Sequence, residues 1–118
     1  MDSRELLRQS EELAQRQARL EGVTRAHPYL QAGEDLESAY PDDAEHWFEV
    51  YRELARAKQE LIEHVQEKIQ CASTPVAAEE LRRDEQLWKV ELERIQLHRR
   101  YWQERVAPAA ADPQPSSG

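Results

Sequence analysis

The chain has 118 residues and a net charge of −8; 39% of its residues are hydrophobic, 34% are charged and only three are glycine. This length suits one small domain, and abundant charge with little glycine is typical of long helices. Because the chain has no basic stripe and no run of about 20 apolar residues, we expect neither a nucleic-acid partner nor a membrane.

The first residues of the chain, Met1 to Glu5, do not resemble a signal peptide. The single cysteine, Cys71, cannot form an internal disulfide and fits a reducing compartment. We therefore expect a cytoplasmic protein.

Residues 2–21 are predicted to form the first helix. Its leucines recur every seven residues, at Leu6, Leu13 and Leu20. Asp2 and Glu5 have the spacing of a capping box. This apolar stripe is too thin to keep the helix folded alone. The helix therefore packs on the rest of its own chain, which we favour, or pairs with a helix of another copy or another protein.

Residues 22–42 are predicted to connect this helix to the next. Residues 28–46 contain six acidic and no basic side chains. We expect apolar residues of the connection to pack on the aromatic end of the hairpin described next: Tyr29, Leu30, Leu36 and Tyr40. A short helical turn is expected at Glu34–Ala39. Alternatively, residues 34–45 serve as an acidic docking segment for a basic groove on a partner.

Residues 43–70 and 75–106 are predicted to form a long antiparallel, coiled-coil-like hairpin, which gives the chain an all-α fold. Apolar residues recur on both arms at steps of three and four, and the second arm has a seven-residue repeat: Leu81, Trp88, Ile95 and Trp102. Because the break between the arms is short, the numbers of facing residues should add up to about 145. Tyr51 should thus lie near His98, Tyr101 and Trp102.

The ends of both arms carry capping signals. Asp42 and Glu45 have the spacing of a capping box after Pro41. Ser73 or Thr74 can cap the second arm, and Pro75 suits its first position. Residues 1–106 are expected to form a single helical domain, and residues 107–118, rich in proline and small side chains, a disordered tail.

Three apolar residues of the second arm, Leu87, Val90 and Leu97, fall outside its main seam. They either widen the apolar face for a third helix or form a surface for a partner. Aromatic side chains gather where the hairpin opens. The predicted interaction or core surface therefore comprises eight residues: Trp47, Tyr51, Leu87, Trp88, Val90, Leu97, Tyr101 and Trp102.

No catalytic, cofactor-binding or metal-binding signature stands out. The second arm lacks the Glu-x-x-His motif that di-iron bundles require, and three glycines make no phosphate loop. We expect a non-enzymatic scaffold or adaptor without a cofactor, which binds a protein partner or a second copy of itself. The alternative is a small metal- or ligand-binding protein that uses His46, His64 and His98 with nearby carboxylates.

Overall fold

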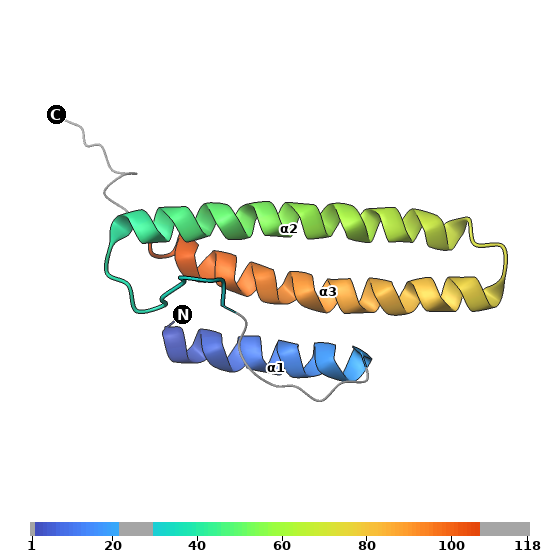
Figure 1. Cartoon of the computed structure of the whole chain (residues 1–118), viewed down its shortest axis with the longest axis horizontal. Coiled ribbons are helices and arrows are strands. Elements are labelled where there is room, and N and C mark those ends of the chain that lie inside the picture. The colour runs from blue at the N-terminus through green and yellow to red at the C-terminus, as the bar shows by residue number, and fades with distance from the viewer. Residues whose placement is uncertain (1, 22–29, 107–118) are drawn as a thin grey trace.

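The computed structural model describes residues 2–21 and 30–106, which form three helices: α1 (Ser3–Glu21), α2 (Pro41–Gln70) and α3 (Pro75–Gln103). Helices α2 and α3 pack antiparallel along their length, and α1 lies on α3 on the side away from α2 (Figure 1). Within the described residues α1 and α2 do not pack on each other, so α3 is the central helix. The predicted all-α hairpin and the packing of the first helix on its own chain are both confirmed.

The two arms of the hairpin begin with proline. Helix α3 starts as predicted: the Thr74 hydroxyl oxygen accepts a hydrogen bond from the Ala77 backbone N–H at 3.1 Å, and Pro75 follows the cap. In contrast, the capping box predicted at Asp42 and Glu45 is wrong. Helix α2 starts at Pro41, and Tyr40 occupies the cap position without a side-chain cap bond. Proline lacks an N–H and has a preset φ, so it suits the first helical position and moves the start upstream.

At the start of α1, half of the predicted capping box forms. The Asp2 carboxylate accepts a hydrogen bond from the Glu5 backbone N–H at 2.8 Å. The Glu5 side chain does not return this bond, because it accepts hydrogen bonds from Arg8 and Gln9 instead.

The register of the hairpin differs slightly from the prediction. Lys58 contacts Trp88, Arg99 lies over Phe48, Tyr51 stacks on His98, and Gln66 binds Glu85. The residue numbers in these pairs add up to 146–151 rather than 145. Side chains on a helix lean toward its N-terminus by about one position, so two antiparallel helices together shift the sum to about 147. The larger sums come from pairs of long side chains, which reach further along the helix.

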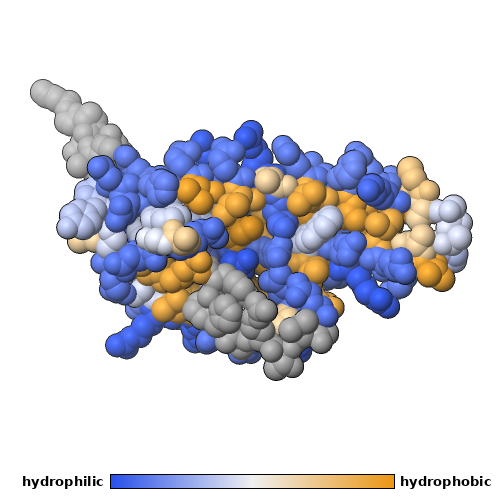
Figure 2. All heavy atoms as spheres, in the orientation of Figure 1, coloured by the Kyte–Doolittle hydropathy of each residue, from blue (hydrophilic) through white to orange (hydrophobic). Residues whose placement is uncertain are grey.

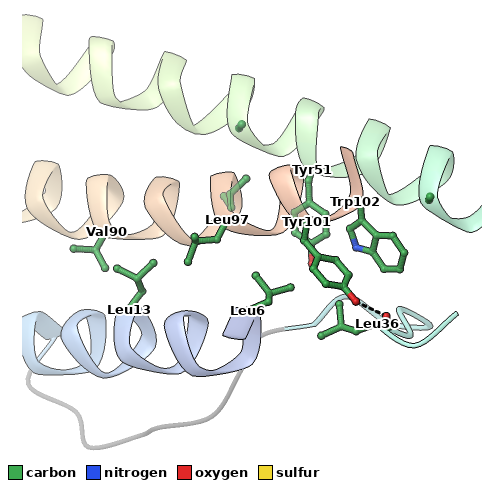
Figure 3. Close-up of a cluster of buried hydrophobic side chains, with 11 residues drawn as sticks. Leu6, Leu13, Leu36, Tyr51, Val90, Leu97, Tyr101 and Trp102 are labelled. Atoms are coloured by element: carbon green, nitrogen blue, oxygen red, sulfur yellow. Dashed lines mark hydrogen bonds between the residues drawn. The ribbon is translucent and has the colours of Figure 1, made fainter. Parts of the chain in front are cut away.

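The hydrophobic core lies at the open end of the hairpin. Tyr51, Tyr101, Trp102 and Leu6 are each at most 1% exposed. Figure 3 shows Leu6 and Leu13 of α1 on the side of α3 that carries Leu97 and Val90. Val90 and Leu97 therefore contribute to the core beneath α1. These two residues lie outside the hairpin seam because they pack against a third helix.

Residues 30–40 of the connection form two tight turns rather than the helical turn predicted at Glu34–Ala39. Backbone hydrogen bonds run from Glu34 to Gln31 and from Ser38 to Asp35, and Gly33 has a φ of +84° that favours glycine. Leu36 is buried as predicted, and its carbonyl accepts a 2.5 Å hydrogen bond from the Tyr101 hydroxyl.

The packing predicted for Leu30 and Tyr40 does not form. Leu30 is 41% exposed and Tyr40 is 73% exposed. Tyr40 has extended backbone angles at the cap of α2, and its ring takes no part in the core. Tyr29 and the tail of residues 107–118, which was predicted to be disordered, lie outside the described residues.

A bilayer-spanning helix needs about 20 predominantly apolar residues. None of the helices in the described residues meets this requirement of length and apolarity.

Candidate functional site

A buried polar cluster joins the connection to all three helices at the open end. We call it the Glu34 junction and define it by its five residues: Ser10, Glu34, Tyr51, His98 and Trp102. One carboxylate oxygen of Glu34 accepts a hydrogen bond from the Trp102 indole N–H at 2.7 Å. The other accepts hydrogen bonds from the Tyr51 hydroxyl and from the Gln31 backbone N–H, the latter at 2.9 Å. Both oxygens of the buried carboxylate are thus satisfied.

His98 extends the junction to the first helix. Its Nε2 lies 3.1 Å from the Ser10 hydroxyl oxygen, and its ring stacks on Tyr51 with a centroid distance of 4.9 Å. Its Nδ1 lies 3.6 Å from a Glu34 carboxylate oxygen, which is beyond hydrogen-bond length. This nitrogen has no hydrogen bond within the described residues.

Opposing effects set the pKa of the Glu34 carboxyl. Burial raises this pKa, but the interactions with His98, Tyr51, Trp102 and the Gln31 backbone together lower it below its ordinary value. Burial also raises the pKa of the Tyr51 hydroxyl, and donation to the Glu34 carboxylate raises it further. The junction therefore consists of an ionised carboxylate and a neutral phenol at neutral pH.

The order Ser10, His98 and Glu34 resembles a nucleophile, base and acid in a hydrolytic triad. Catalysis by such a triad requires a nucleophile that the substrate can reach. Ser10 and His98 are both 0% exposed, and Glu34 already accepts three other hydrogen bonds. This geometry suits a structural junction, and we assign it no reaction.

The structure places the eight residues of the predicted interaction or core surface in two environments. Five are buried: Tyr51, Val90, Leu97, Tyr101 and Trp102. Three are only partly buried: Trp47, Leu87 and Trp88. Trp47 packs against the core cluster and meets His46 edge-on at a centroid distance of 4.6 Å. Trp88 lies under the Lys58 ammonium, 5.9 Å from the ring centroid. Of the eight, only the three partly buried side chains, Trp47, Leu87 and Trp88, can contact another molecule without unfolding of the core.

The histidines considered as metal ligands do not converge. His46 and His64 are exposed on α2, about 27 Å apart along the helix axis at 1.5 Å per residue. His98 is buried in the Glu34 junction. In residues 2–21 and 30–106, no group of three His, Cys, Asp or Glu side chains is placed to hold an ion. Cys71 is an exposed free thiol at the tip of the hairpin.

A groove runs between α1 and α3, with a volume of about 1130 Å³. The two helices are antiparallel with a fixed register, because Ser10 faces His98, Arg16 binds Glu93 at 2.8 Å and Gln17 binds Glu91. Every residue that lines the groove belongs to one of these two helices. The groove is therefore separate from the α2–α3 packing seam.

Sequence reasoning missed the role of Glu34 and Ser10. We interpreted Glu34 as part of an acidic segment that could dock on a partner, whereas it is only 8% exposed. The sequence did contain a usable signal: a buried tyrosine or tryptophan needs an acceptor for its O–H or N–H. Glu34 lies two residues before the apolar Leu36 and is one candidate for that acceptor, together with Asp35 and Glu37, which flank Leu36 directly. Other acids of this segment, including Asp42 and Glu45, are exposed.

No protein-family model, curated protein or solved structure matches this chain.

Proposed function

We propose that the protein is a non-catalytic helical scaffold or adaptor, and that the half of the hairpin beyond α1 binds a helix of another protein or of a second copy. We call this half, residues 57–88, the distal hairpin. One observation carries the proposal: from Pro75 to Lys89, α3 has no buried side chain, although this stretch contains Leu81, Leu87 and Trp88.

The lengths of the helices leave the distal hairpin uncovered. Helix α1 has 19 residues, whereas α2 has 30 and α3 has 29. Figure 1 shows that α1 ends well before the turn between α2 and α3. At the open end α1 and the connection cover the hairpin, but among the described residues the distal hairpin has only the contact between its own two helices.

Burial along α2 agrees with this difference. In its distal part only Ile62 and Val65 are buried, while Leu61 is 43% exposed. Val76, at the start of α3, is 69% exposed. Figure 2 shows a broken band of apolar side chains on α2 and α3 that continues toward the turn past the end of α1. Apolar surface of this kind on a helical hairpin is suited to packing against a further helix.

Site-specific photocrosslinking in cells that express the protein tests this proposal. A photoreactive amino acid is placed at Leu61 or at Val76, both of which are exposed. The control position is Arg56, which is exposed on the same helix but about 140° around it from Leu61. We expect a discrete adduct from the two apolar positions and none from Arg56. The mass of the adduct distinguishes a second copy from another protein.

Two results together would refute the proposed role. The first is crosslinking at Leu61 and Val76 that does not exceed crosslinking at Arg56. The second is a monomeric mass by light scattering at every protein concentration. A partner that crosslinks equally at all three positions would also contradict the assignment to the apolar face.

The alternative of a metal- or ligand-binding protein stays a separate proposal with its own test. No described group of side chains supports it, as His46, His64 and His98 lie apart. Elemental analysis of the purified protein would favour it if a stoichiometric metal were found.

A further inference from the structure

The part of the connection that we call the strap, residues 30–40, is anchored to the helices by two side chains. Of its eleven residues only Glu34 and Leu36 are buried, and the others are exposed or partly exposed. Its backbone forms two tight turns rather than a helix. The position of the strap therefore depends on the surface beneath it, which α2 and α3 provide.

This surface contacts the Glu34 carboxylate with donors from two helices. The Trp102 indole N–H of α3 donates to one oxygen at 2.7 Å, and the Tyr51 hydroxyl of α2 donates to the other. Both donor side chains are at most 1% exposed, so the packing of α2 on α3 fixes their positions. A hydrogen bond to an ionised acceptor is roughly twice as strong as one between neutral groups. The two donors therefore favour a carboxylate at this position.

The same surface holds Leu36 by its side chain and by its backbone. The Tyr101 hydroxyl donates to the Leu36 carbonyl oxygen at 2.5 Å, as the dashed line in Figure 3 shows. The Leu36 side chain is 6% exposed and belongs to the core cluster. Asp35 is exposed, and its carboxylate accepts a hydrogen bond from the Glu37 backbone N–H within the strap. The helices thus bury a glutamate and a leucine two positions apart but not the residue between them.

This pattern resembles that of a bound peptide. Recognition of short extended segments combines main-chain hydrogen bonds with pockets for alternate side chains. Glu34 and Leu36 are alternate residues, and the Leu36 carbonyl supplies a main-chain contact. Unlike a separate peptide, the strap is covalently linked to α2, which begins at Pro41. Such a link gives a segment an effective concentration on the order of millimolar, so a separate peptide must compete with it.

The helices also have contacts with one another that do not involve the strap. Lys58 of α2 pairs with Glu91 of α3 at 2.5 Å, and Arg16 of α1 pairs with Glu93 of α3 at 2.8 Å. Opening of the strap breaks neither pair. The surface beneath the strap can therefore become accessible while the three helices stay folded.

We propose that the strap is an autoinhibitory segment, which occupies a site on α2 and α3 for a partner peptide that has glutamate followed two positions later by leucine. In the closed form Tyr51, Tyr101 and Trp102 beneath the strap are at most 1% exposed. The partner peptide replaces the strap and accepts the same hydrogen bonds. This inference goes beyond the proposed scaffold role and uses a surface separate from the distal hairpin. Crosslinking at Leu61 and Val76 can succeed or fail independently of it.

Titration with the sequence of the strap tests this site. The probe is a synthetic peptide of residues 30–40, and the receptor is the full chain with E34Q/L36A, whose own strap lacks both anchors. The Trp102 indole N–H resonance, assigned by its absence in Trp102→Phe, reports binding by NMR. We expect the peptide to shift this resonance with a dissociation constant on the order of 1 mM or below. In the unchanged chain the same shift should require about tenfold more peptide or greater, because the tethered strap competes.

Matched controls separate recognition of the anchors from a general effect of charge. D35N/E37Q changes two exposed carboxylates of the same strap and keeps both anchors, so this variant should bind the peptide as weakly as the unchanged chain. A peptide with glutamine and alanine in place of the two anchors should not shift the Trp102 resonance of E34Q/L36A. The milder variant E34Q keeps the leucine anchor and should bind the peptide with intermediate affinity. Circular dichroism of each variant should show unchanged helix content.

Four results would overturn the proposal. Absence of a shift in folded E34Q/L36A at about 10 mM peptide, tenfold above the expected dissociation constant, would show that the helices form no such site. Equal shifts with the peptide that lacks both anchors would mean that binding is unspecific. Equal affinity of E34Q/L36A and the unchanged chain would show that the strap does not compete. Loss of helix content in both E34Q/L36A and E34Q would mean that the helices cannot stay folded once the strap opens.

Discussion

One carboxylate, Glu34, accepts hydrogen bonds from the connection, α2 and α3. Its donors are the Gln31 N–H, the Tyr51 hydroxyl and the Trp102 indole. Removing such an acceptor leaves buried donors unsatisfied, which costs about 1–3 kcal/mol for each group. Glu34 is therefore the residue on which the ordering of the connection most depends.

The lowered pKa of Glu34 predicts a pH dependence of stability. In the folded state the pKa of this carboxyl lies below its ordinary value of 4.5. The ionised carboxylate therefore stabilises the fold fully above pH 4.5, and this stabilisation is lost as the pH falls through the lower, folded-state pKa. Glu34→Gln should be less stable at neutral pH and should lose less stability on acidification. Chemical denaturation at several pH values measures both effects; parallel stability profiles for the two proteins would contradict the role of the ionised carboxylate.

Two tryptophans with the same heptad spacing should respond differently to truncation. Trp102 is 1% exposed and hydrogen-bonded to Glu34, whereas Trp88 is only partly buried on the distal hairpin. Trp102→Ala should cost about 3–5 kcal/mol of unfolding free energy, and Trp88→Ala should cost less. Urea denaturation of both variants makes the comparison. Equal costs would show that the distal hairpin is as well covered as the open end.

The difference in burial between Trp88 and Trp102 could not be predicted from the sequence. The repeat of Leu81, Trp88, Ile95 and Trp102 predicted one helical seam. Periodicity reports which face a residue occupies, but not whether a third element covers that face at a given level along the helix. That coverage depends on where α1 and the connection pack, and for Trp102 it includes a hydrogen bond to Glu34, which is distant in the chain.

Among the elements, α3 has the best-defined start. The Thr74 hydroxyl accepts the Ala77 N–H, and the adjacent Ser73 makes no such cap. Thr74→Ala should destabilise the protein by about 1 kcal/mol, and Ser73→Ala should have little effect. Thermal or urea unfolding of the two variants decides between them. A larger loss in Ser73→Ala would mean that the helix starts one residue earlier.

Element boundaries followed from the sequence where local chemistry decides them. The Thr74 cap and the start of α3 at Pro75 depend on backbone groups within three or four residues and were predicted, whereas α2 was predicted to start at a capping box on Asp42 and starts at Pro41. The course of the connection could not be predicted in the same way, since Glu34 and Leu36 are placed by partners on α2 and α3. The pairing of α1 with α3 was expected only as one of two arrangements, because a thin leucine stripe packs equally well in cis or in trans.

At the scale of the whole molecule, the fold combines a well-covered end with a poorly covered one. The open end contains the core cluster and the Glu34 junction, while the distal hairpin buries only Ile62 and Val65. Helices without tertiary cover gain little stability beyond their intrinsic propensity. The distal hairpin should therefore open locally at lower free energy than the rest, and a partner helix that covers it would raise that free energy.

Native-state hydrogen exchange of the free protein tests this central claim most directly. We predict that backbone amides around Tyr51, Ile95 and Trp102 exchange only through global unfolding, whereas amides of residues 57–88 exchange through local openings of lower free energy. Protection factors measured by NMR report both classes in one sample. Protection in the distal hairpin that equals protection at the open end would contradict the account, because an uncovered surface would then be stable without a partner.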